Sequence, residues 1–138
     1  MLVNASNVVD VRDKITRLFS SLYNLEVEED QVFDENELKE FLRKASKIAP
    51  EAVKTRSELP SFDFGQPPEI ILGLRSHKAY ALDFGDAIYY GEVRIDQPHV
   101  PCGKGIKVFR KSKQIDEAWF YSESTIVGRG RWIGGSTK

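Results

Sequence analysis

The chain has 138 residues, a mass of 15.7 kDa and a formal net charge of −1. Its composition, 41% hydrophobic and 30% charged, excludes disordered and fibrous proteins and predicts a domain with a buried core. The sequence has no apolar run of about 20 residues, which a membrane-spanning helix needs, and no signal-peptide pattern. It contains a single cysteine. We therefore expect an intracellular location, cytoplasmic or cytoskeleton-associated.

Charge is unevenly distributed along the chain. Residues 1–69 contain 14 acidic and nine basic residues, whereas residues 100–138 contain three acidic and eight basic residues. Such segments attract each other or serve different partners. Because the pI is about 6.1, we expect no nucleic acid partner.

The first half of the chain has the pattern of amphipathic helices. Apolar residues recur every three or four positions over residues 8–25 and again from Asp34 onward, where Glu37 completes a capping box. Pro50 ends this second helix and suits the first turn of a short third one, over residues 50–58. We therefore expect a helical region over residues 1–59 and a Pro-rich connector over residues 60–78.

The two long helices and the acidic loop between them resemble an EF-hand. The resemblance implies a calcium-responsive adaptor, but Gln31 replaces the glycine that the tight calcium loop requires. The alternative is a pair of amphipathic helices around a solvated loop. The weak calcium candidates are Glu26, Glu28, Asp30, Asp34 and Glu37.

From about residue 79 the apolar period changes to two, which is typical of strands. Residues 80–84 and 87–93 form a hairpin around a Gly85-Asp86 turn, and a second hairpin follows over residues 105–120 with a basic turn at 110–113. A last strand spans residues 130–133. The two copies align at an offset of 25–26 residues, which indicates an internal repeat over residues 79–138.

The repeated segments resemble the MORN (membrane occupation and recognition nexus) repeat over roughly residues 79–133. The matching residues are Tyr89-x-Gly91-Glu92, Gly103-Lys104-Gly105 and, in a degenerate second copy, Trp119 and Gly128-Arg129-Gly130. The second copy departs from the pattern at Ile115 and Glu117. The resemblance implies hairpins joined edge to edge in a structural or assembly protein of cytoskeletal, ciliary or membrane-apposed settings.

We therefore predict an α+β fold in which the N-terminal helices pack against, or cap, a short antiparallel β-meander of MORN-like hairpins. The alternative is an unrelated α+β domain with a curved antiparallel sheet. We expect Tyr89, Trp119 and Trp132 to supply most of the buried apolar area.

The sequence offers little catalytic chemistry. His99 and Cys102 have the residue types of a base and a nucleophile, but they are more simply loop residues. The carboxylates Asp83, Asp86 and Glu92 are expected to be solvated hairpin residues. We expect neither an enzyme nor a cofactor.

The leading hypothesis is a non-catalytic scaffold, a subunit of a larger assembly that binds a partner protein or a second copy of itself. The last strand has no following repeat and is expected to be an exposed edge open to strand addition. The candidate partner-binding residues are Tyr89, Trp119, Phe120, Arg131, Trp132 and Ile133.

An alternative hypothesis is a peripheral binder of anionic phospholipids. Basic residues around one hairpin turn and the following strand would each contribute about 1 kcal/mol near such a membrane. These residues are Lys104, Lys107, Arg110, Lys111, Lys113 and Arg129.

Overall fold

The computed structural model describes residues 32–134, in which two helices precede a β-sheet. Helix α3 (Glu35–Ile48) begins at Asp34, whose side chain accepts a hydrogen bond of 2.9 Å from the Glu37 N–H, as the capping box predicts. Helix α4 (Pro50–Glu58) follows after Ala49, because a residue before proline avoids the helical conformation. The helix predicted over residues 8–25 lies outside the described residues.

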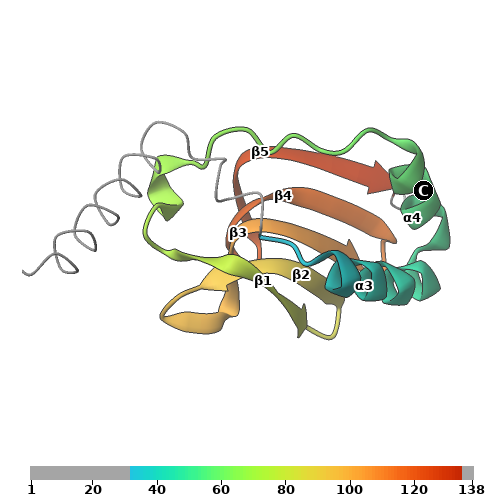
Figure 1. Cartoon of the computed structure of the whole chain (residues 1–138). Helices are drawn as coiled ribbons and strands as arrows, with labels where there is room; N and C mark the ends of the chain where they lie inside the picture. The colour runs from blue at the N-terminus through green and yellow to red at the C-terminus, as the bar shows by residue number, and fades with distance from the viewer. Residues whose placement is uncertain (1–31, 135–138) are drawn as a thin grey trace, which may run out of the picture. The chain divides into compact units, whose positions relative to one another are not determined.

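The sheet is an antiparallel meander in which each strand pairs with its neighbour in sequence, in the order β1-β2-β3-β4-β5 (Figure 1). The α+β prediction is confirmed. Among residues 32–134, no helix combines the length and apolar character needed to cross a bilayer. The remaining elements are η1 (Glu69–Ile71), β1 (Arg75–Asp83), β2 (Ala87–Arg94), β3 (Gln97–Phe109), β4 (Gln114–Ser122) and β5 (Thr125–Gly134).

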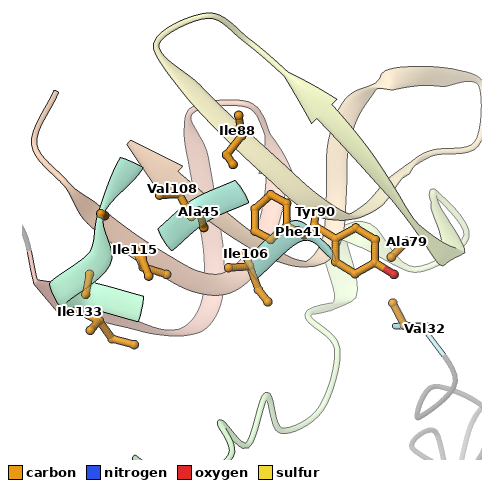
Figure 2. Packing of buried hydrophobic residues seen from close by; sticks show 12 residues of the cluster. Val32, Phe41, Ala45, Ala79, Ile88, Tyr90, Ile106, Val108, Ile115 and Ile133 are labelled. Atoms are coloured by element: carbon orange, nitrogen blue, oxygen red, sulfur yellow. The ribbon is translucent and has the colours of Figure 1, made fainter. Parts of the chain in front are cut away.

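Both helices pack on one face of the sheet, α3 over β2 and β3 and α4 over β4 and β5. Phe41 of α3 stacks on Tyr90 of β2 with ring centroids 5.7 Å apart (Figure 2). The Tyr90 hydroxyl donates to Glu37 Oε1 (3.0 Å), and burial raises the pKa of Tyr90 to about 12. The buried residues of this core are Val32, Phe41, Ala45, Ala49, Ala52, Ala79, Ile88, Tyr90, Ile106, Val108, Ile115 and Ile133.

The segment between α4 and η1 runs past β5 (Figure 1), and its residue Phe64 packs on Trp119 of β4. The Trp119 indole N–H donates to the Phe64 carbonyl (2.6 Å), and the two rings meet edge to face at 5.7 Å. These residues form a second cluster with Ile71 and Cys102. A ring from β4 is thus buried by a chain segment about 55 residues away in sequence.

The opposite face of the sheet contains a smaller cluster. Tyr89 and Phe120 meet edge to face with centroids 5.2 Å apart and are both buried. Trp132 is 61% exposed. The prediction that Trp132 contributes to the buried apolar area is therefore wrong, whereas Tyr89 and Trp119 do contribute.

Candidate partner-binding edge

The structure divides the six predicted partner-binding residues into a buried set and a surface set. Tyr89, Trp119, Phe120 and Ile133 are buried and make core contacts. Their burial argues against direct contact with a partner. The sequence did not predict this burial, because the period of a strand does not show which face other segments cover. The candidate surface therefore narrows to Trp132 and the half-buried Arg131.

Register across the sheet determines which way the backbone of Trp132 points. The Phe84 N–H bonds to the Ala87 carbonyl (2.9 Å), which closes the β1–β2 hairpin and makes Leu82 and Tyr89 a hydrogen-bonded pair. A residue whose N–H and C=O bond to one neighbouring strand directs them away from the other. Tyr89 bonds to β1, so Tyr89 and Lys107 are a non-hydrogen-bonded pair, and the next pair across the sheet is hydrogen-bonded.

That next pair joins Lys107 to Asp116, and Asp116 in turn lies opposite Trp132. The Asp116–Trp132 pair is therefore of the non-hydrogen-bonded kind, which directs the N–H and C=O of Trp132 away from β4. Within residues 32–134, no backbone hydrogen bond joins β5 to any segment other than β4. The backbone of β5 thus offers a template for another strand.

Arg131 is held in place by groups on the helical side of the sheet. Its guanidinium donates to Glu117 Oε1 (3.0 Å) and to the Pro60 carbonyl (2.9 Å). Glu117 is buried and also accepts from Arg56 of α4 (2.9 Å). This arrangement fixes β5 to α4 and to the connector, so Arg131 stabilises the edge rather than extending from it.

The six basic residues proposed for lipid binding do not share one surface. Lys107 is 5% exposed and donates to the Glu123 carbonyl (2.6 Å), while Lys104 lies over the Phe64 ring (5.4 Å) on the opposite face. The other four are Arg110, which pairs with Asp83 (3.1 Å), Arg129, which pairs with Asp63 (3.6 Å), and Lys111 and Lys113, which are exposed in the β3–β4 turn.

Glu92 is buried at the centre of a hydrogen-bond network and is not the solvated residue that we expected from the sequence. Its Oε1 accepts from the Arg75 guanidinium (2.9 Å) and the Lys104 N–H (2.8 Å), and its Oε2 accepts from the His77 N–H (2.8 Å). Arg75 in turn lies 5.1 Å from the centre of the Trp119 ring. The Tyr-x-Gly-Glu spacing was the one sequence signal for this position.

The structure describes only two of the five calcium candidates. Glu26, Glu28 and Asp30 lie outside the described residues, whereas Asp34 caps α3 and Glu37 accepts from the Tyr90 hydroxyl. Across residues 32–134, no three His, Cys, Asp or Glu side chains are grouped so that they could hold a metal ion.

We compared the chain with known proteins and found no relative. No family model, curated protein or solved structure matches the chain. The MORN and EF-hand resemblances therefore stay predictions, which rest on the residues quoted for them.

Cys102 is expected to be inert in the folded protein. It is fully buried beside Trp119, and burial raises the pKa of its thiol, so little reactive thiolate forms near neutral pH. We expect iodoacetamide to label Cys102 only after urea unfolds the chain, as mass spectrometry would show. Rapid labelling of the native protein at neutral pH would contradict this burial.

Proposed function

We propose that this protein is a non-catalytic interaction subunit that binds a partner protein along β5 by strand addition. The supporting observation is the position of Trp132, a large exposed aromatic residue on an edge strand, whose own N–H and C=O are among the outward backbone groups of that strand. Strand addition supplies affinity through main-chain hydrogen bonds and specificity through neighbouring side chains.

Two physical features favour this edge as a binding site. An exposed edge strand with an apolar side chain favours pairing with another chain unless charge or proline blocks it. Tryptophan is also among the residues that most often dominate binding energy at protein interfaces. The ion pairs of Arg131 and Arg56 with Glu117 hold this edge rigidly, so little ordering would be needed on binding.

The MORN resemblance supports the same proposal from another direction. Such repeats imply roles in cytoskeletal, ciliary or membrane-apposed assemblies, and we propose a cytoplasmic or cytoskeleton-associated location on that basis. A second copy of this chain, which would form a homodimer, is one candidate partner for β5.

Point variants of Trp132 test strand addition more sharply than deletion of the last strand, which would also remove buried Ile133 from the core. Trp132→Pro removes the ring and the outward N–H, while Trp132→Val removes only the ring; proline is tolerated on an edge when its N–H faces outward. We expect Trp132→Val to weaken partner retention roughly 30-fold and Trp132→Pro to abolish it, in quantitative affinity capture and in sedimentation for self-association.

Ile95→Ala is the matched control, because Ile95 is a similarly exposed apolar residue in the β2–β3 turn. We expect it to retain partners as the unchanged protein does. Equal retention by Trp132→Pro and the unchanged protein would exclude β5 as the binding edge.

A further inference from the structure

A groove separates α3 from β1 at the opposite edge of the sheet from β5. It consists of two adjoining hollows of about 480 Å³ and about 400 Å³, which share Phe41, Lys44 and Ala81 in their walls. The buried residues Phe41, Tyr90 and Ile88 lie beneath the groove as its floor, and Figure 2 shows Phe41 and Tyr90 next to each other in the core. The groove is thus long, apolar at its base and bordered by an edge strand.

The backbone of β1 that borders this groove has outward-facing groups. The Ala79 N–H points away from β2, since it donates to the Val32 carbonyl (3.0 Å). Every second residue of a strand directs its N–H and C=O to the same side, so those of Ala81 and Asp83 also point outward. The hairpin bond between Phe84 and Ala87 gives the same alternation independently.

Within the described part of the chain, Val32 provides the only backbone group bonded to this side of β1 between Ala79 and Asp83. Beyond Val32 the chain turns away to enter α3. Ala81 and Asp83 therefore leave room for a short extended segment to pair with β1.

Charge around the groove is basic near Asp83. Asp83 is itself neutralised by Arg110 (3.1 Å), and Glu40 by Arg43 (2.6 Å). Lys44 and Lys47 both line the hollow at this end and are exposed, and neither makes an ion pair within residues 32–134. This end of the groove thus favours a negatively charged group.

We infer that the α3–β1 groove binds an extended acidic peptide segment of a partner, which adds to β1 as an antiparallel strand. The outward N–H and C=O of Ala81 and the outward N–H of Asp83 pair with the peptide backbone. Alternate side chains of the peptide lie against Ala81 and Lys44, the exposed residues that line both hollows. Because β1 runs toward Asp83, the amino end of the peptide lies beside Lys44 and Lys47, and its acidic residues are at that end.

Two matched peptide arrays test this inference on the full-length protein. Each array contains fluorescent peptides of about eight residues, randomised without proline or cysteine after a fixed amino-terminal pair, Glu-Glu in one array and Lys-Lys in the other. We expect binders in the Glu-Glu array, enriched in apolar residues at alternate positions, and none of comparable affinity in the Lys-Lys array.

Variants of the groove separate its backbone contribution from its charge. Ala81→Pro removes an outward N–H that the β1–β2 ladder does not use, and we expect it to weaken the selected Glu-Glu peptides roughly tenfold or more. Ala81→Ser keeps the N–H and should weaken the selected peptides less than Ala81→Pro does. The double variant Lys44→Glu/Lys47→Glu should lose the Glu-Glu peptides and gain Lys-Lys peptides, and it remains informative if Ala81→Pro does not fold.

Three results would overturn the inference: no binder in the Glu-Glu array, binding that survives both Ala81→Pro and the charge reversal, or a homodimer that Ala81→Pro dissociates. The last result would mean that a second copy of the chain occupies the groove. Trp132→Pro should leave peptide binding unchanged, so failure of the β5 proposal and failure of this one are distinguishable.

Discussion

Replacing Glu92 with alanine is expected to lower the free energy of unfolding by about 3–5 kcal/mol. The variant would remove the Glu92 carboxylate that accepts from the buried Arg75 guanidinium and from the His77 and Lys104 N–H groups. Loss of a carboxylate that compensates a buried charge is costly, and the loss of each hydrogen bond to a backbone N–H adds to that cost. Urea unfolding followed by circular dichroism would measure the change.

The matched control is Glu123→Ala, because Glu123 is exposed in the β4–β5 turn and its side chain makes no ion pair among the described residues. We expect this variant to change the free energy of unfolding by less than about 0.5 kcal/mol. A Glu92→Ala variant as stable as this control would show that the buried network contributes little.

Gly105→Ala is expected to destabilise the protein by about 3 kcal/mol through overpacking. A Cβ atom at residue 105 would lie 2.4 Å from the Tyr89 ring, closer than non-bonded carbon atoms approach. Tyr89 is fully buried and its hydroxyl donates to the Glu92 carbonyl (2.6 Å), so the ring has little freedom to move aside. The midpoint of urea unfolding would report the loss.

Two further variants separate overpacking from other effects. Gly85→Ala adds a Cβ in open space at a φ of +86°, so it should cost only the backbone strain of about 1 kcal/mol. The double variant Gly105→Ala/Tyr89→Leu should lose less stability than the two single changes together, because the smaller side chain relieves the contact. Strict additivity in this cycle would contradict a direct clash.

Local signals in the sequence predicted the elements well where a single residue decides the backbone conformation. Asp34 starts α3 and Pro50 starts α4, because capping and proline geometry act within one turn. The Gly85-Asp86 turn predicted the first hairpin for the same reason. The strands were longer than expected: β3 begins at Gln97 and β5 at Thr125, since polar and proline residues at these ends obscured the alternation.

The candidate site was less predictable because burial depends on what covers each face. Lys107 was placed on a lipid-binding turn, yet the β4–β5 turn reaches it and buries it. Glu92 looked like a surface carboxylate, and its partner Arg75 gave no sequence signal at all. The α3–β1 groove also had no sequence signature, because it is made by residues about 40 positions apart.

The sequence by itself determined where α3, α4 and the β1–β2 and β3–β4 turns lie and that an antiparallel meander follows the helices, because caps, prolines and periodicity act locally. Only the tertiary structure decided which of two similar tryptophans is exposed. The connector from Pro60 to Phe64 crosses the sheet over Trp119 and not over Trp132. Alternation along a strand sets the face of a side chain, but burial requires a second layer, and that layer comes from a distant part of the chain.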